Sequence, residues 1–172
     1  MPGPGIHVDE LKAAVTGYAR AYMFNIVFTS VPPAQELKYD KIAYLVKSGT
    51  LPGSSIEPLE VAWQGQVQKI GGTHTFDTWE VTFNVDYNAT IKKSMDKWSK
   101  AVHDPTSNIH GKPKDYYGSA NVELLDTKGE PLVTYKIVDM WPSEVAAIEL
   151  GQETKEIATF AVTFTYNYHE IV

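Results

Sequence analysis

The sequence predicts a mainly β fold, an antiparallel β-sandwich or barrel of six to seven strands with one packed α-helix. Alternating apolar and polar residues recur along the 172 residues, and this period of two is typical of half-buried strands. Only residues 88–102 combine a long stretch with helical spacing. Gly, Pro and Asn separate the stretches, and neither a repeat nor a linker divides them, so residues 1–172 are expected to form one domain.

The N-terminal third is expected to contain two strands and two irregular parts. Residues 1–17 begin with alternating Pro and Gly and predict a flexible arm followed by a short helix that Asp9 caps and Gly17 ends. Aromatic and β-branched residues predict strands at Arg20–Ser30 and Ile42–Val46. Residues 47–60 hold two Gly, two Pro and three Ser, which predicts a long loop.

Two hairpins are expected next. Trp63–Ile70 and Phe76–Asp86 read as strands joined by a turn at Gly71-Gly72. Ser119–Leu125 and Leu132–Met140 read as a second pair, joined by a type I turn at residues 126–129.

The last strand, Ile157–His169, alternates most clearly, with Phe160, Val162 and Phe164 on one side and threonines and an asparagine on the other. A pattern this regular predicts a strand with one buried face and one polar face.

The expected helix, residues 88–102, has an apolar face and a basic face. Ile91, Met95, Trp98 and Val102 recur at helical spacing, and Asn88 is the expected N-cap. The opposite face holds four lysines: Lys92, Lys93, Lys97 and Lys100. With one aspartate the stretch has a net charge of +3, so the rest of the chain carries −9 of the total of −6.

Composition excludes several classes of function. The absence of cysteine rules out disulfides, thiolate metal sites and a cysteine nucleophile, and the acidic balance argues against general nucleic-acid binding. No apolar run is long enough to span a membrane as a helix, and no secretory signal is visible. The five histidines lie apart, and no serine sits in a nucleophile elbow. We therefore expect no catalytic residues, no cofactor and no metal.

The polar sides of the expected strands hold small or neutral groups where an ordinary wet sheet face usually mixes in more Lys and Glu. Such a face is either simply solvated or lines a wettable passage that adheres little to what moves through it. The candidates for the second role are Gln64, Gln66, Gln68, Glu80, Thr82, Asn84, Thr163 and Thr165.

Three ordered segments resemble the tail tube proteins of contractile-tailed bacteriophages, from about residue 18 to the end. The first is the strand Thr75–Phe83, and the second runs from the helix to the following loop. The third resembles that family's closing section. The matching residues outside the first segment are Met95, Trp98, Gly111, Lys112, Pro113, Tyr116, Met140, Trp141, Pro142, Ser143, Val145, Leu150, Ile157, Thr159, Phe160 and Val162.

The resemblance implies a structural virion protein rather than an enzyme. Members of this family form hexameric rings with a continuous inner β-barrel, and the rings stack into a hollow tube that conducts DNA during sheath contraction. The implied partners are further copies of the chain, the tail sheath, the baseplate and tail terminator proteins, and DNA that passes without specific binding. The implied location is the virion tail, with the host cytoplasm before assembly and no stable membrane association.

Roles for particular residues follow from that resemblance. The polar strand residues become candidates to line the lumen, and the four helix lysines become candidates to contact the sheath. The arm of residues 1–10 is expected to order on assembly, as is the loop of residues 47–60, and both would contact the next ring. The ring-stacking candidates are Lys47, Ser48, Gly49, Thr50, Leu51, Pro52, Gly53, Ser54, Ser55 and Ile56.

Three alternatives stay open at this point. A tube of a type VI secretion system or a contractile bacteriocin has a similar fold. A carbohydrate-binding β-sandwich would use some of the 4 Trp and 10 Tyr as a stacking platform. A barrel enzyme would need a catalytic constellation that the sequence does not reveal.

Overall fold

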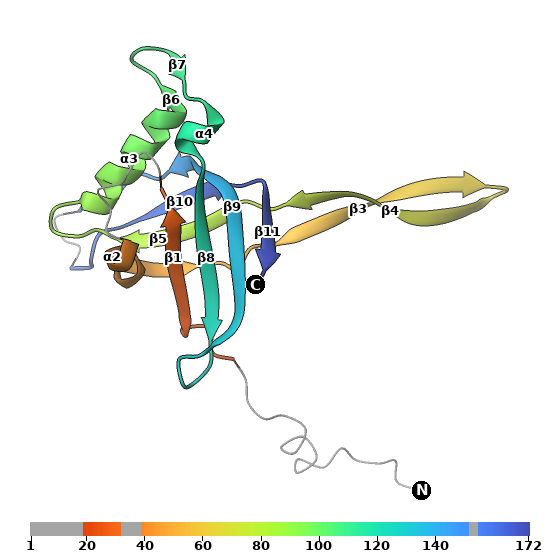
Figure 1. Ribbon diagram of the computed structural model, residues 1–172, viewed down its shortest axis with the longest axis horizontal. Helices are drawn as coiled ribbons and strands as arrows, with labels where there is room; N and C mark the ends of the chain where they lie inside the picture. Colours follow the sequence, from red (N-terminus) through yellow and green to blue (C-terminus); the bar gives the residue numbers. More distant parts are fainter. Residues whose placement is uncertain (1–18, 32–38, 152–154) are drawn as a thin grey trace, which may run out of the picture.

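The computed structural model describes residues 19–31, 39–151 and 155–172, and its described part is mainly β (Figure 1). Seven antiparallel strands form the main sheet in the order β1-β8-β9-β10-β5-β2, with β11 also paired to β9. Their bounds are Phe24–Ser30 (β1), Val46–Gly49 (β2), Trp79–Asn84 (β5), Gly118–Leu125 (β8), Pro131–Val145 (β9), Thr159–Thr165 (β10) and Tyr168–Ile171 (β11). This architecture confirms the expected fold class.

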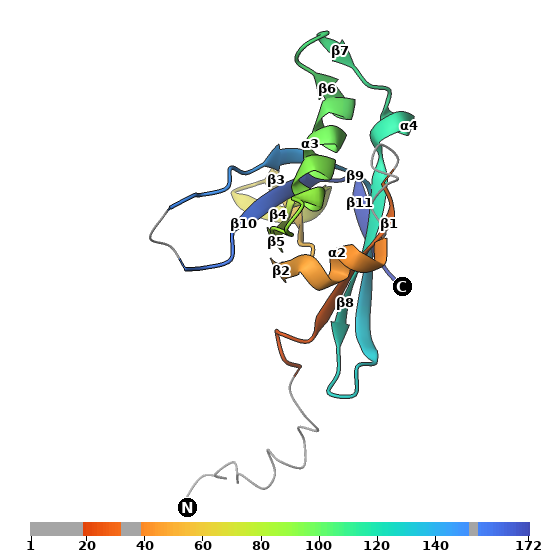
Figure 2. The ribbon, with the colours of Figure 1, turned by 90° about the vertical axis from the view of Figure 1, so that its left-hand side faces the viewer.

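Strand β9 folds the sheet into two layers. Its first part pairs with β8 and β11, whereas Trp141–Val145 pairs with β10. Asp139, close to the junction of the two parts, has a φ of 56°, a left-handed conformation that turns the strand. The Asn167 side-chain amide donates a hydrogen bond to Asp139 Oδ2 at 3.1 Å and supports this turn. As a result β10 and β5 cross the direction of β1 and β8 (Figures 1 and 2).

The core lies between these layers. Its largest fully buried side chains are aromatic: Trp79, Trp98, Phe28, Phe83 and Phe164. Phe28 on one layer lies with its ring centroid 5.8 Å from that of Phe164 on the other. The alternation predicted for residues 157–169 is confirmed, although the strand ends at Thr165 and a separate strand, β11, follows.

The predicted helix is confirmed as α3, Thr90–Val102, which buries Ile91, Met95 and Trp98. The N-cap prediction is wrong, because Ala89 occupies that position with a φ of 50°. Asp86 satisfies the helix end instead, since its Oδ1 accepts the Thr90 N–H at 2.7 Å. Burial alone would raise the pKa of the Asp86 carboxyl, but the hydrogen bonds from Thr90 outweigh it and lower the pKa.

Two short helices accompany α3. The Trp98 indole N–H donates to the Tyr116 carbonyl at 2.6 Å in α4, Pro113–Tyr116. The strand expected at 42–46 is wrong, because residues 39–45 form helix α2, Tyr39–Leu45. Ile42 is buried and Leu45 packs against the core, and this i,i+3 spacing belongs to a helical turn. A run of five apolar residues is too short to distinguish a helical turn from a strand. Among the described helices none is long and apolar enough to cross a membrane.

The expected loop at 47–60 is also wrong. Residues 46–49 form β2, and residues 54–60 open a long strand, β3 (Ser54–Trp63), which pairs with β4 (Gln66–Phe76). The turn of this hairpin is Gln64-Gly65, where both residues have positive φ, as in a two-residue turn. The expected turn at Gly71-Gly72 lies inside β4, where a Cβ on Gly72 would come within 2.6 Å of the Glu57 carbonyl oxygen.

The remaining expectations divide between confirmed and untested. The β8–β9 hairpin is confirmed, and Gly129 in its turn has a φ of 84°. A two-stranded ladder, β6 (His103–Asp104) and β7 (Ile109–His110), follows α3. The arm and short helix expected at residues 1–17 lie outside the described residues.

Candidate assembly surfaces

Strands β5 and β10 bring five of the eight lumen candidates onto one polar face. Glu80 pairs with Thr163 and Thr82 with Ala161, while Asn84 pairs with Thr159. Thr165 continues this face along β10, and at the flanks Glu144 lies beside Thr163. These paired positions hold two carboxylates and no basic side chain, and none of the five candidates is in the buried core.

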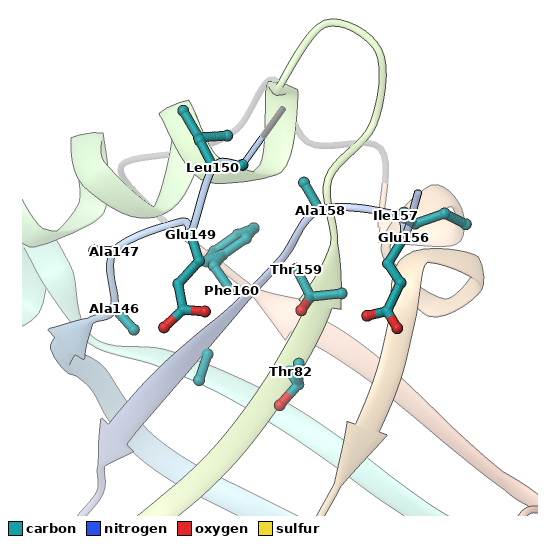
Figure 3. A pocket seen from close by; sticks show the side chains of 12 residues that line it. Thr82, Ala146, Ala147, Glu149, Leu150, Glu156, Ile157, Ala158, Thr159 and Phe160 are labelled. Carbon is teal, nitrogen blue, oxygen red and sulfur yellow. The ribbon is translucent and has the colours of Figure 1, made fainter. Parts of the chain in front are cut away.

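A pocket of about 430 Å³ opens on the same face. Thr82 and Thr159 form part of its floor, and the segments on either side of residues 152–154 form its walls (Figure 3). Glu149 and Glu156 extend from these walls and add two more carboxylates (Figure 3). Among the described residues no group of three or more His, Asp or Glu side chains is arranged to hold a metal ion.

The other three lumen candidates lie elsewhere. Gln64 is in the turn of the β3–β4 hairpin, and Gln66 and Gln68 are on β4, where they pair with Trp63 and Val61. The hairpin projects well beyond the two-layered body (Figure 1), so these glutamines are not brought to the β5–β10 face. The sequence pattern predicts one continuous strand over these residues, whereas the chain reverses at Gln64-Gly65.

One face of the projecting hairpin holds most of its large apolar side chains. Cross-strand pairing puts Leu59, Val61, Trp63 and Ile70 on it, which are 59%, 44%, 75% and 47% exposed, together with Gln66 and Gln68. The opposite face holds Ala62, Val67 and an ion pair between Lys69 and Glu60 at 3.3 Å. A two-stranded hairpin is marginally stable alone, so an exposed apolar face of this kind suits contact with another chain.

The ring-stacking candidates divide into two groups. Residues 50–53 are held to the body: the Trp79 indole N–H donates to the Thr50 carbonyl at 2.7 Å, and Pro52 is buried. Lys47, Ser48 and Gly49 belong to β2, so of the ten only Ser54, Ser55 and Ile56 lie on the hairpin. Sequence reasoning missed Leu59, Val61 and Trp63, although their alternation before a Gln-Gly turn is a strand signal.

The helix lysines are not equivalent. Lys92 is half-buried, forms an ion pair with Asp96 at 2.9 Å, and lies with its Nζ 5.5 Å from the centroid of the Phe160 ring. Lys93 is exposed and donates to the Asn88 carbonyl at 3.0 Å. Lys97 and Lys100 are also exposed. The outward basic surface of α3 therefore consists of Lys93, Lys97 and Lys100.

The aromatic residues offer no sugar platform in the core, because Trp79 and Trp98 are fully buried. A two-layered β fold with a neutral or acidic sheet face and a projecting hairpin that exposes apolar side chains suits a protein that assembles with other chains. The chain belongs to the phage tail tube protein family, which it matches over residues 16–172. It therefore has a structural role in a phage tail tube, and the resemblance noted in its sequence is confirmed.

Relatives of known identity agree with this assignment. The chain is 23% identical over 158 residues to the tail tube protein of Serratia phage KSP90, covering 88% of this chain and 89% of the relative. It is 26% identical over 132 residues to the baseplate tail-tube junction protein gp54 of Enterobacteria phage T4. That match covers 76% of this chain but only 41% of gp54, which is the longer protein.

Solved structures of contractile injection systems share the fold. A chain from the PVC sheath/tube terminator in its extended state superimposes with a TM-score of 0.68 at 14% identity, covering 92% of this chain and 99% of that one. A chain from the PVC sheath-tube complex in its extended state gives a TM-score of 0.62 at 14% identity, with 98% and 99% covered.

Proposed function

We propose that six copies of this chain close into a ring and that stacked rings form a hollow tube through which phage DNA passes. The observation that carries the proposal is the β5–β10 face, a sheet surface that is neutral or acidic outside and fully apolar inside. Such strands suit a barrel with a wet lumen and a dry outer layer. Strands β1 and β2 end the sheet path within the described chain, and ring closure would protect such edges by pairing them.

The charges on that face suit a conduit rather than a binding site. Glu80 and Glu144 lie on it, and Glu149 and Glu156 border the pocket beside it. Proteins hold DNA by placing Lys and Arg against its phosphates, whereas carboxylates repel them. Six copies would carry a formal charge of −36 per ring, which favours passage of DNA without adhesion. We assign Glu80, Thr82, Asn84, Thr163 and Thr165 to the lumen.

The β3–β4 hairpin is the proposed contact between subunits, in place of the loop first expected at 47–60. Its apolar side chains are exposed in the single subunit, and a second copy would bury them. Burying one large apolar side chain contributes about 1.5–3 kcal/mol, so four per subunit would contribute substantially to tube growth.

Electron microscopy of the purified protein tests the tube and its lumen together. We expect hollow tubes built from six-fold rings, with Glu80, Thr82 and Thr163 facing the channel in a reconstructed map. Solid filaments, or a map that places these three side chains on the outer wall, would contradict the proposal.

The outward lysines of α3 are the proposed contact with the tail sheath. Exposed ion pairs are individually worth about 0–1 kcal/mol, which suits an interface that must release when the sheath contracts. Reversing Lys93, Lys97 and Lys100 to Glu should weaken sheath recruitment by about tenfold per subunit while bare tubes still form. Co-sedimentation of sheath with preformed tubes measures this effect.

Lys92 is left unchanged in that variant, because its ion pair with Asp96 supports the helix itself. A control with the same charge change reverses the exposed Lys114, Lys128 and Lys155, which lie on other elements. If the α3 variant recruits sheath as well as this control does, the sheath contact lies elsewhere.

The remaining partners follow from the same role. The similarity to a baseplate tail-tube junction protein and to a sheath/tube terminator supports end contacts with baseplate and terminator proteins. The proposed location is the virion tail, after accumulation of subunits in the host cytoplasm.

A further inference from the structure

The direction of the projecting hairpin is set at its root. Residues 54–75 are exposed throughout β3 and β4, and Phe76 is the first half-buried side chain of the hairpin. A strand rises about 3.3 Å per residue, so ten residues form a lever of about 33 Å, and a swing of about 10° at the root moves the tip by about 6 Å. Contacts made by Trp63 at the tip therefore depend on how firmly the root is held.

A chain of hydrogen bonds ties the root to the end of the protein. The Gly53 carbonyl, just before β3, accepts the Asp77 N–H at 3.1 Å and the Tyr166 hydroxyl at 3.2 Å. The Tyr166 oxygen lies 3.2 Å from His169 Nδ1 in β11. Since the hydroxyl has one proton and gives it to Gly53, His169 Nδ1 must be the donor in the second bond.

Aromatic rings pack around the same point. The Phe76 ring centroid lies 4.6 Å from that of His74, 5.1 Å from that of His169 and 6.0 Å from that of Tyr166. The Tyr135 ring of β9 also packs against His169, with the two ring centroids 5.6 Å apart. Two imidazoles thus contact one phenyl ring at the point where the hairpin leaves the body.

We propose that Tyr166 and His169 are positioning residues that fix the angle of the β3–β4 hairpin, and that protonation of His169 loosens this clamp. The clamp is a property of the single subunit. Its importance for tube growth rests on the proposed function of the hairpin, which is tested separately.

The charges at the root give the direction of the pH effect. Burial, and then the nearby His74, lower the pKa of His169 below its ordinary value of 6.5. Burial, and then the Asp77 charge, raise the pKa of Tyr166 to about 12, so its hydroxyl stays a donor. Tyr135 also faces His169, while Glu170 is paired with Lys136 at 3.1 Å.

When packing lowers the pKa of a histidine, the neutral imidazole favours the packed state, and this stabilisation is fully present above pH 6.5. As the pH falls through 6.5, the loosened state takes up the proton first, and the clamp weakens until His169 is protonated in both states. The added proton goes to Nε2, because Nδ1 already carries one, so the hydrogen bond to Tyr166 is kept. The clamp weakens because a charge is then placed among the packed rings of Phe76, Tyr135 and Tyr166.

Distance measurements between two spin labels test the clamp directly. The chain has no cysteine, so Gln64→Cys at the hairpin turn and Lys128→Cys in the β8–β9 turn give one defined pair. In dilute single subunits we expect a narrow distance distribution at pH 7.5 that broadens by several ångströms at pH 5. His169→Gln keeps a donor but cannot titrate, so it should stay narrow at both pH values, whereas Tyr166→Phe should be broad at both.

His110→Gln serves as the matched control, since it removes an exposed histidine in β7, distant in sequence from the root of the hairpin, and should behave as the intact protein does. Circular dichroism confirms that each variant is folded at both pH values. An unchanged distribution in the intact chain between pH 7.5 and 5, or equal broadening in His169→Gln, would overturn the proposal. Because single subunits are measured, a failure to form tubes leaves this result intact.

Discussion

Replacing residues 57–73 with an Asn-Gly turn should abolish tube growth while leaving the subunit folded. The cut joins Ile56 to His74, which are paired across the two strands, and it keeps the root of the hairpin. The residues removed are all exposed in the single subunit, so the free energy of unfolding should change by less than about 1 kcal/mol. Assembly should fail because Leu59, Val61 and Trp63 leave with them.

A milder pair of variants separates the apolar face from the rest of the hairpin. Changing Leu59, Val61 and Ile70 to Thr keeps the strand propensity but removes three of the four large apolar side chains of that face, and it should slow or stop tube growth. Changing Glu60 and Lys69 to Gln alters the opposite face and should not. Light scattering and electron microscopy, under conditions in which the intact chain grows tubes, report the outcome. If the variant in which an Asn-Gly turn replaces residues 57–73 grows tubes normally, the hairpin is not part of the tube interface.

The parts of the fold that the sequence predicts well are those whose pattern matches burial within one subunit. Phe160, Val162 and Phe164 alternate with threonines in β10 because one side of that strand meets the core. Ile91, Met95 and Trp98 recur at helical spacing for the same reason in α3. Local periodicity and tertiary burial agree there, so the pattern alone suffices.

The hairpin could not be predicted in this way, since its apolar side chains are not buried within the subunit. Leu59 and Val61 face solvent in the single chain, while Gly, Pro and Ser around them resemble a loop. The strand prediction at Ile42–Val46 is wrong for another reason, because a run this short fits a strand or a helical turn equally well. Both are cases in which local residues do not determine what they pack against.

The candidate lumen face shows the same division. Glu80, Thr82 and Thr163 meet because β5 and β10 are in register, and each strand alone predicts which of its side chains point outward. Gln64, Gln66 and Gln68 share only their chemical character with these residues. The reversal at Gln64-Gly65 separates them, because pairing between distant strands, rather than composition, decides which polar residues share a face.

The largest loss of stability from one substitution is expected for Trp79→Ala. Trp79 is fully buried, pairs with Phe164, and lies with its ring centroid 5.4 Å from Phe164 and 6.1 Å from Phe28. Truncating a buried Trp or Phe to Ala costs about 3–5 kcal/mol through lost burial and the cavity that remains. A typical domain has only about 5–15 kcal/mol of stability, so much of the Trp79→Ala variant should be insoluble on expression.

Trp79→Phe separates the packing of the indole from its hydrogen bond. Phenylalanine keeps most of the ring contacts but leaves the Thr50 carbonyl without the donor that now lies 2.7 Å away, which should cost about 0.5–1.5 kcal/mol. Trp63→Ala is the matched control, because that ring is 75% exposed at the hairpin tip and its loss should change stability by less than about 0.5 kcal/mol. Denaturant titration of the single subunits gives all three values. A loss below about 1 kcal/mol for Trp79→Ala would contradict its place at the centre of the core, since that is too small for a cavity of this size.

Both Trp79 variants lose the hydrogen bond to the Thr50 carbonyl. Because Thr50 begins the segment that leads into Gly53, both should also loosen the root of the hairpin.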